Sequence, residues 1–330
     1  MTDFTVLVLP GAYASSVAVT LDMLQAAATV APFLSAPRPR WRIASPLPGP
    51  VPLSSGLQLA ARALPARAER STWIIPGLGV DQPQALEQRL QQDDARATGD
   101  ALRRHVAHGG SVAASCSAVF LLHHAGLLAG RRATTSWWLA GSLRQQAPEC
   151  EVAAEQMVCV DGPLCTAGAA LAQSDMMLHL LRSRFGTALA ERVARLLLLD
   201  AREAQSPFVV PSMLAQGNEL IRQLTRRIDA SLPQLPDVGT LAAEQAMSSR
   251  TLSRHVRAAT GQGVLALIQS VRLNRARRLL ESSRLSIEQI AAQVGYADAT
   301  ALRRLMRKAT GVTPSRFRGG GGGEGRTSDV

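Results

Sequence analysis

Apolar residues in the first two hundred positions gather in short runs, and stretches with helical periodicity lie between and after them. The apolar runs predict buried strands at 4–9, 41–44, 72–76 and 111–115. The periodic stretches predict helices at 17–30, 94–107, 169–185 and 188–200. Strands that alternate with helices usually form a parallel sheet with helices on both faces. This part of the chain therefore predicts an α/β domain.

The last hundred residues carry one helix-turn-helix pattern twice. The copies span Leu241–Gly261 and Ile290–Gly311, and residues 264–283 between them form one amphipathic helix. Each copy has an apolar-Ala-Ala start, a short polar turn, an arginine-rich helix and an Ala-Thr-Gly end. Such repetition predicts one structural unit used twice. Two such units place two reading helices in successive major grooves of DNA, about 34 Å apart.

The helical spacing predicts which face of each reading helix is exposed. Ser248 or Ser249 can cap the first reading helix and Asp298 the second, because a side-chain oxygen satisfies free N–H groups there. Arginine pairs bidentately with guanine or holds phosphate, and the spacing does not decide which. The outward residues that we expect to contact DNA are Arg250, Ser253, Arg254 and Arg257 in the first copy and Thr300, Arg303, Arg304 and Arg307 in the second.

The basic charge of the chain lies in the same part as the repeat. The net charge is +11, and from residue 205 onward 18 Lys and Arg face 9 Asp and Glu, which is +9. The first 204 residues hold 18 against 16, which is +2. A polyanion-binding module joined to a near-neutral domain shows this asymmetry. A helical bundle whose arginine faces are only solvated is the alternative.

Length and cysteine usage limit the class of protein. The 330 residues suffice for two domains or more. No run of about 18 uncharged apolar residues is present, and the start MTDFTVLVLPG has no basic region, so we expect neither a membrane span nor a signal peptide. Cys116, Cys150, Cys159 and Cys165 form no CxxC pair or metal-like spacing. We expect a reduced, cytoplasmic protein with no metal and no cofactor, in which Cys150, Cys159 and Cys165 are ordinary small apolar residues.

One cysteine stands where chemistry is possible. Cys116 follows the predicted strand 111–115 and precedes the apolar helix AVFLLHHAGLL, which is the geometry of a nucleophile elbow. A helix N-terminus lowers the pKa of a thiol, and a low pKa with exposure would suit a redox sensor. The backbone near Gly77 and Gly79 could supply N–H donors to an anionic group.

The C-terminal repeat resembles a known domain. Residues 237–318 look like the AraC-type DNA-binding domain, and VGYADATALRRLMRKATGVTPSRFR (294–318) carries the signature of that family. Met306 stands where an aromatic residue is usual, which predicts looser packing. The resemblance implies sequence-specific regulation of transcription.

The first two hundred residues resemble the ThiJ/PfpI-like, or class I glutamine amidotransferase-like, fold. The matching pieces are VLVLPGAYASSVAVTLDML, WIIPGLG, ASCSAVFLLHHAGLLAGRRATTSWW and DGPLCTAGAALAQSDMMLHLLRSRFG. With the QSPF segment (205–208), the whole chain resembles the GlxA family of AraC-type regulators. The resemblance implies a flavodoxin-like parallel-sheet α/β domain followed by an all-α tandem helix-turn-helix domain.

Departures from the enzymes of this fold argue against catalysis. Those enzymes usually add a histidine near the cysteine or a glutamate on the first loop, and here Ser117 and Ser16 stand at those positions. A cysteine without a base is a poor nucleophile. We therefore predict no catalytic residue, but an effector pocket made of Asp22, Gly77, Gly79, Cys116, Thr135, Ser136 and Trp137.

These predictions combine into one reading of the chain. Residues 1–204 bind an effector and dimerise, 205–236 form a linker with a connecting helix, 237–318 bind DNA, and 319–330 are a disordered tail. We expect a homodimeric transcriptional activator without membrane contact, whose partners are promoter DNA, RNA polymerase and a small effector. The resemblance alone points to an amine or amino-acid derivative. The alternatives are a cysteine-dependent hydrolase or amidotransferase carrying a DNA-binding domain, and an effector-free architectural regulator.

Overall fold

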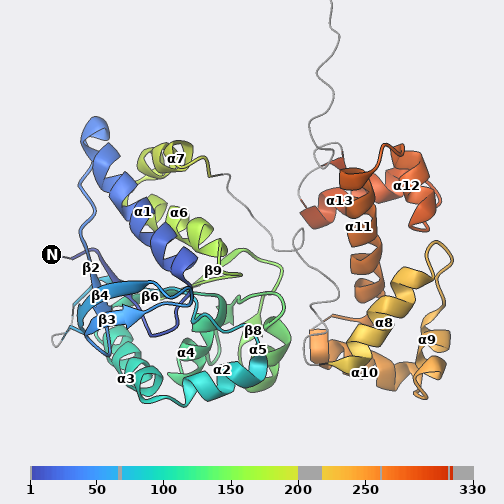
Figure 1. The fold of residues 1–330 in the computed structure, drawn as a ribbon, viewed down its shortest axis with the longest axis horizontal. Coiled ribbons are helices and arrows are strands. Elements are labelled where there is room, and N and C mark those ends of the chain that lie inside the picture. The colour runs from blue at the N-terminus through green and yellow to red at the C-terminus, as the bar shows by residue number, and fades with distance from the viewer. Residues whose placement is uncertain (1, 66–68, 200–217, 261, 311–312, 315–330) are drawn as a thin grey trace, which may run out of the picture. The chain divides into compact units, whose positions relative to one another are not determined.

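The chain divides into two compact units, Met1–Gln205 and Ser206–Val330, in the computed structural model (Figure 1). The structure describes residues 2–65, 69–199, 218–260, 262–310 and 313–314. The QSPF segment (205–208) and the predicted tail at 319–330 lie outside the described residues. Each unit has hydrophobic clusters of its own, two in the first unit and two in the second.

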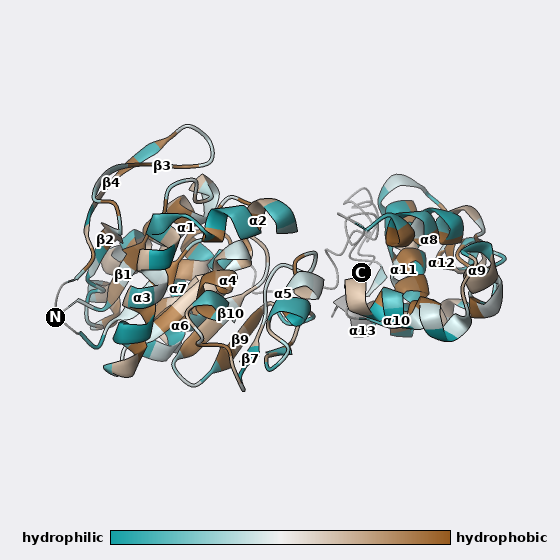
Figure 2. Ribbon diagram, turned by 90° about the horizontal axis from the view of Figure 1, so that it is seen from below, coloured by the Kyte–Doolittle hydropathy of each residue, from teal (hydrophilic) through white to brown (hydrophobic). Residues whose placement is uncertain are grey.

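An eight-stranded sheet in the order β3-β4-β2-β1-β5-β6-β10-β9 forms the centre of the first unit. Its strands are β1 (Phe4–Leu7), β2 (Trp41–Ser45), β3 (Gly49–Pro52), β4 (Gln58–Ala63), β5 (Thr72–Ile75), β6 (Ser111–Ser115), β9 (Val158–Asp161) and β10 (Leu164–Ala167). The inner strands are parallel, and the edge strands β3 and β9 are antiparallel to their neighbours. The four predicted strands are confirmed as β1, β2, β5 and β6. Figure 2 shows the β3–β4 hairpin standing away from the body of the sheet.

Helices cover both faces of this sheet. One face carries α1 (Ala14–Val30), α6 (Ala172–Phe185) and α7 (Thr187–Leu196), and the other carries α2 (Pro83–Leu90), α3 (Asp93–Ala107), α4 (Val119–His124) and α5 (Ala140–Gln146). Consecutive side chains of β1 alternate between the faces, because a strand has a period of two. Val6 and Val8 accordingly lie in one core, and Leu7 and Leu9 in the other. A short parallel pair, β7 (Arg132–Ala133) and β8 (Glu151–Val152), lies beside the main sheet.

Helix α1 is the one segment whose composition raises the question of a membrane. Residues Ala14–Leu34 are long and apolar enough to cross a bilayer by length and composition alone, which the sequence prediction did not anticipate. Core helices of globular domains pass the same test. Val17, Met23, Leu24 and Ala27 of α1 are buried against the sheet and its helices.

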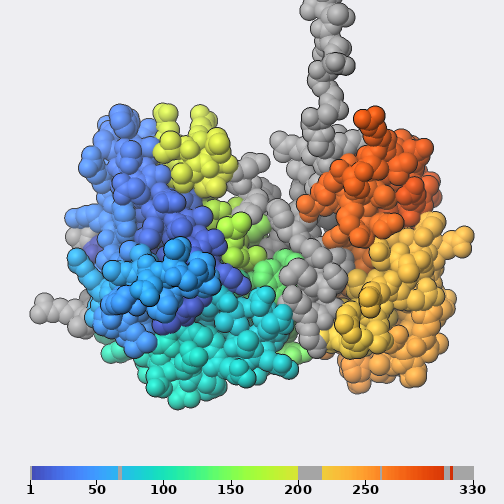
Figure 3. Space-filling view, in the orientation of Figure 1, coloured from blue at the N-terminus to red at the C-terminus, as the bar shows by residue number. Residues whose placement is uncertain are grey.

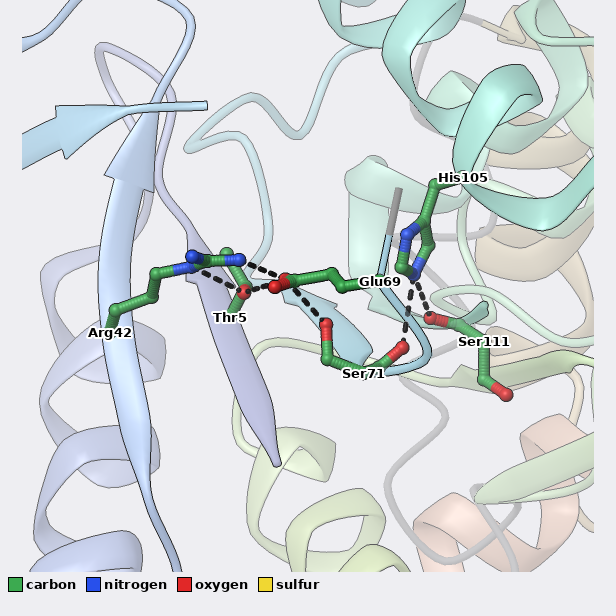
Figure 4. Close-up of polar contacts among 6 residues, drawn as sticks. All are labelled: Thr5, Arg42, Glu69, Ser71, His105 and Ser111. Atoms are coloured by element: carbon green, nitrogen blue, oxygen red, sulfur yellow. Dashed lines mark hydrogen bonds and ion pairs between the residues drawn. The ribbon is translucent and has the colours of Figure 1, made fainter. Parts of the chain in front are cut away.

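The amino-terminal edge of the sheet is held by a polar network around Glu69 (Figure 4). The Glu69 carboxylate accepts hydrogen bonds from Thr5 Oγ1 at 3.2 Å and Ser71 Oγ at 2.8 Å, and it forms an ion pair with Arg42. Burial opposes ionisation of this carboxyl, but the bonds from Ser71, Arg42 and Thr5 prevail and lower its pKa. The network therefore ties β1, β2 and the start of β5 together.

His105 extends this network to β6. Its Nε2 lies 3.0 Å from the carbonyl oxygen of Ser71 and 3.2 Å from that of Ser111, so it must carry a proton and donate (Figure 4). The ring stacks on Trp73 with centroids 4.2 Å apart. A side chain on Gly110 would overlap the imidazole. The group is structural, because it lies at the opposite end of the strands from Cys116.

The second unit is all-helical and has two small cores. Its helices are α8 (Glu219–Ala230), α9 (Val238–Glu244), α10 (Ser249–Thr260), α11 (Val264–Ser282), α12 (Ile287–Gln293) and α13 (Ala299–Thr310). Helices α8, α9 and α10 pack on the first half of α11, and α12 and α13 pack on its second half. Figure 3 shows these two groups of helices next to each other, the first in yellow to orange and the second in red. Met306 is 1% exposed and lies in the second of these cores.

The predicted connecting helix, α8, packs into the second unit. Ile221, Leu224 and Ile228 of α8 are almost completely buried in the first of these cores. Residues 205–217 of the predicted linker lie outside the described residues. The amphipathic stretch at 264–283 is confirmed as α11.

Candidate DNA-binding surface and effector pocket

Both reading helices begin at the predicted caps. Ser248 Oγ accepts from the backbone N–H of Thr251 at 3.1 Å, and Asp298 Oδ1 accepts from that of Ala301 at 2.8 Å. The second bond is the largest of the effects that lower the pKa of Asp298, so its carboxylate stays charged beside a helix N-terminus. The two turns are thus fixed locally, before any packing of the helices is considered.

The first reading helix lines an open groove. All four of its predicted DNA contacts, Arg250, Ser253, Arg254 and Arg257, are exposed along α10 and line a groove of about 750 Å³. Leu252 and Val256 point the other way and are fully buried, as the helical period predicts. Within the described part of the chain, no ion pair joins these three arginines to a carboxylate. The face therefore presents free positive charge.

The second reading helix has the same exposed face with one difference. Thr300, Arg303, Arg304 and Arg307 are exposed on α13, while Leu302 is buried. The Arg303 guanidinium lies 3.0 Å from the Glu288 carboxylate on α12, and both side chains are more than half exposed. Nothing in the sequence pattern predicted this ion pair, because the two residues lie 15 positions apart.

One arginine outside both reading helices shapes the second turn. Arg272 of α11 places its guanidinium 3.5 Å from the centroid of the Tyr296 ring. Its Nε donates to the carbonyl of Val294 at 2.7 Å, and its Nη2 donates to that of Gly295. Gly295 has a φ of +79°, and a side chain there would press on the Pro233 carbonyl. Sequence reasoning missed Arg272, since it reads as one more exposed charge on an amphipathic helix.

In the first unit, the carboxyl ends of β1, β5 and β6 bring four loops together. The chain passes from β1 outward to β2 and β4, then returns to β5 on the other side of β1, which makes a topological switch point. Ligands of open α/β sheets bind at such points, outside the carboxyl ends of the strands. The backbone N–H of Tyr13, after β1, donates to the carbonyl of Gly77, after β5, at 2.9 Å.

Cys116 stands at the centre of these loops. It follows β6 directly and has a φ of +55°, an unusual value for a residue with a side chain and the one expected of a nucleophile elbow. Thr135 Oγ1 donates to its carbonyl at 2.7 Å, and Ser136 Oγ lies 3.0 Å from its Sγ. A side chain on Gly77 would meet the Cys116 Cβ at 3.0 Å. Four predicted pocket residues, Gly77, Cys116, Thr135 and Ser136, therefore meet in one place.

The thiol of Cys116 is shielded from solvent and disfavoured as a thiolate. Cys116 is fully buried, and burial raises the pKa of its thiol despite hydrogen bonds from Ser136 and Ser117. A redox sensor would need a thiol with a low pKa and an exposed position, and Cys116 has neither here. The turn after Cys116 is a 3-10 turn of three residues followed by the short helix α4, which supplies less field than a long helix would.

The other predicted pocket residues are placed unevenly. Trp137 is 7% exposed and makes an edge contact with Trp138 at 5.1 Å. Gly79 has a φ of +71° and lies against the carbonyl of Gly11, so it shapes the loop after β5. Asp22 is exposed on α1, off the stripe of that helix that faces the core.

Two residues that the sequence did not mark border the same place. Burial, with smaller effects of Cys116 and Asp81, raises the pKa of Tyr13 to about 12. Asp81 also adds to the rise at Cys116, so an exposed carboxylate lies near both groups. Tyr13 could have been found from the sequence, because Gly11-Ala12-Tyr13 directly follows the first predicted strand. Asp81 could not, because it lies in a loop without a recognisable sequence pattern.

The remaining cysteines and acids form no further centre. Cys150, Cys159 and Cys165 are buried and free, as predicted, and burial raises the pKa of Cys165 to about 12. Among the residues that the structure describes, no three His, Cys, Asp or Glu side chains are grouped to hold a metal ion.

A positively charged tandem helix-turn-helix unit joined to an α/β domain defines a class: DNA-binding regulators with a fused α/β domain. Two family profiles match this division, the helix-turn-helix domain over residues 241–320 and the DJ-1/PfpI family over residues 40–183. The chain therefore combines a DJ-1/PfpI domain with an AraC-type helix-turn-helix domain.

Two full-length relatives share both parts. The HTH-type transcriptional regulator GlxA of Rhizobium meliloti is 28% identical over 290 residues, which cover 86% of this chain and 87% of that protein. The HTH-type transcriptional regulator CdhR of Pseudomonas aeruginosa is 25% identical over 323 residues, covering 96% and 91%. A putative transcriptional regulator from Vibrio parahaemolyticus has a similar fold, with a TM-score of 0.50 at 21% identity over 60% of this chain and all of that one. The chain is thus a DNA-binding transcriptional regulator.

Proposed function

We propose that the two arginine faces of α10 and α13 read one promoter site on successive turns of DNA. The single observation that supports this most is their attachment to one rigid helix, α11. Its 19 residues advance about 28 Å, close to the roughly 34 Å between successive major grooves. Arg250, Ser253, Arg254 and Arg257 then meet one groove, and Thr300, Arg303, Arg304 and Arg307 meet the next.

Footprinting on the host's own DNA tests this proposal. The full chain should protect two short stretches about ten base pairs apart at a few sites. Arg254→Ala should remove protection from one stretch only, and Arg304→Ala from the other. Uniform protection of all DNA, unchanged by either substitution, would contradict it and favour an architectural role.

We propose further that the first unit binds a small effector at the switch point and performs no catalysis. The loop residues Tyr13, Gly77, Ser136 and Trp137 offer hydroxyls, backbone and an aromatic face, and Asp81 offers a negative charge. This chemistry suits an amine or amino-acid derivative, the ligand class that the resemblance suggested. A buried, protonated thiol without a histidine among its described hydrogen-bond partners is a poor nucleophile.

A thermal-shift screen of amines and amino acids on the full chain tests this second proposal. A ligand that binds only the folded state stabilises it by about 2.7 kcal/mol at a hundredfold excess over Kd. This stabilisation raises the melting temperature of the chain. Asp81→Asn should abolish the shift, whereas Asp93→Asn, an equally exposed acid at the start of α3, should keep it. Turnover of an amide or aldehyde that is lost in Cys116→Ser would contradict the non-catalytic assignment.

The protein would then act as a cytoplasmic homodimer that activates transcription through contact with RNA polymerase. A dimer matches the symmetry of paired DNA sites. Effector binding must favour one of two conformations to act as a switch. Sedimentation with and without DNA measures the first point, and transcription in vitro with purified polymerase measures the second.

A further inference from the structure

The two reading helices differ in how free their arginines are. On α10, Arg250, Arg254 and Arg257 form no ion pair among the described residues. On α13, the Arg303 guanidinium is 3.0 Å from Glu288, whose carboxylate stands in the first turn of α12. An acid that neutralises one of the predicted DNA contacts calls for an explanation, because it would repel the phosphate backbone.

Comparison of the two copies within the chain shows that this pair is particular to the second. When the closing Ala-Thr-Gly triplets are aligned, Arg254 and Arg257 correspond to Arg304 and Arg307, and Ser253 corresponds to Arg303. When the Ala-Ala starts are aligned, Gly239 corresponds to Glu288. Both partners of the ion pair are therefore absent from the first copy, so the repeat itself does not require them.

The geometry holds Glu288 firmly at this place. Ser286 and Gln289 form a capping box at the start of α12, which fixes the turn that carries the acid. A hydrogen bond from its own backbone N–H, then the Ser286 side chain and Arg303, lower the pKa of Glu288, so it is ionised at neutral pH. Glu288, Ser286 and Arg303 also line one groove of about 500 Å³ beside the reading helix.

A carboxylate beside a reading arginine affects two kinds of DNA differently. Arg303 donates one N–H to Glu288, and a guanidinium has five, so the others remain available to a base edge. Its net attraction for any phosphate is cancelled by the paired charge, and the phosphate contact is the part of binding that is independent of sequence. The pair therefore weakens binding to random DNA more than binding to the correct site.

We propose that Glu288 is a specificity-determining residue, which holds Arg303 for one base and suppresses its use as a phosphate clamp. The proposal rests on the DNA-reading role proposed above for α13. The two reading helices then have different roles. The unpaired arginines of α10 strengthen binding to DNA of any sequence, whereas the paired Arg303 of α13 discriminates between bases.

Binding of the full chain to two duplexes of equal length, its footprinted site and a random sequence, tests the proposal. Glu288→Gln should raise affinity for the random duplex about fivefold at 0.15 M salt, the gain from one further phosphate contact, and steepen the salt slope by about 0.9. Affinity for the footprinted site should change less than twofold. Glu288→Asp keeps the charge and should leave random binding near that of the unsubstituted chain.

Glu244→Gln is the matched control, since it breaks an exposed ion pair between α9 and Arg227 of α8, which involves no residue of a reading helix, and changes the net charge equally. It should leave the ratio of the two affinities unchanged. An equal effect of Glu288→Gln and Glu244→Gln would overturn the proposal, as would an altered base preference without a gain in random binding. If the unsubstituted chain shows no preference for any site, the reading role of α13 fails, and this proposal fails with it.

Discussion

Replacing Arg272 by methionine should unfold the DNA-binding unit at a lower temperature and leave the other unit unchanged. Methionine keeps the length of the side chain that α11 presents but loses every polar contact with the second turn. Two charged hydrogen bonds, to Val294 and Gly295, and the stacking on Tyr296 disappear. The two bonds are each worth about 1.5–3 kcal/mol and the stacking about 0.5–2 kcal/mol.

Solvent reduces these values, because the arginine is only half-buried and water replaces part of what is lost. Burial of the guanidinium also has a cost, which lowers the pKa of Arg272. A net loss of roughly 2 kcal/mol is expected, which lowers the melting temperature of a domain of this size by about 8–16 °C.

The two units can be followed separately, because all four tryptophans (Trp41, Trp73, Trp137 and Trp138) lie in the first unit. Tryptophan fluorescence therefore reports the α/β unit, while far-ultraviolet circular dichroism reports the helices of both. In circular dichroism, Arg272→Met should shift the melting step of the DNA-binding unit to a lower temperature. The midpoint of the tryptophan fluorescence should not move. Arg275→Met, an exposed arginine three residues along the same helix, is the control. Midpoints within about 2 °C of each other for the two variants would refute the reasoning.

Four further outcomes are expected. Gly79→Ala should destabilise the first unit by several kcal/mol, seen in its fluorescence midpoint, because the new Cβ overlaps a backbone carbonyl and the φ of +71° is strained. Burial lowers the pKa of His105, so protonation of this histidine favours the unfolded chain, and the free energy of unfolding of the first unit should fall as the pH drops below about 6.5. A fluorescence melting midpoint that does not change between pH 7 and pH 5 would contradict this. Cys116 should react with iodoacetamide at least a hundredfold more slowly in the folded chain than in urea, and equal rates would mean that the thiol is exposed. Arg254→Ala and Arg257→Ala should each reduce the salt slope of DNA binding by about 1 if they hold phosphate, or cost about 1–3 kcal/mol at one site if they read bases, as titrations at several salt concentrations would show.

Local patterns predicted the elements that depend on local physics. Ser248 and Asp298 cap the reading helices because a short polar side chain before an amphipathic run can satisfy free N–H groups wherever the helix packs. The strand before Cys116 was predictable for a similar reason, since five small or apolar residues between a Gly pair and a helix favour a buried strand.

Properties that depend on distant segments were not predictable. The burial of Cys116 comes from loops after β1, β5 and β7, which the chain brings together from residues 13, 77 and 136. The neighbourhood of the thiol, and with it the rise in its pKa, is therefore a tertiary property. Asp22 was assigned to the pocket by position in a matching segment, but the buried stripe of α1 runs through Ser16, Thr20 and Met23 and leaves the acid outside.

The single helix α11 explains why two short repeats act as one module. Val264, Leu267 and Val271 of its first half lie in one core, and Ala276 and Leu280 of its second half lie in the other. Among the residues that the structure describes, the second core holds seven buried side chains, too few for a unit of that size to be stable alone. Each reader thus depends on a helix that the other reader also stabilises. Because a helix advances 1.5 Å and turns 100° per residue, the residue count of α11, rather than the length of a loop, fixes both the distance and the rotation between the readers. Stability and DNA geometry are therefore set by the same element.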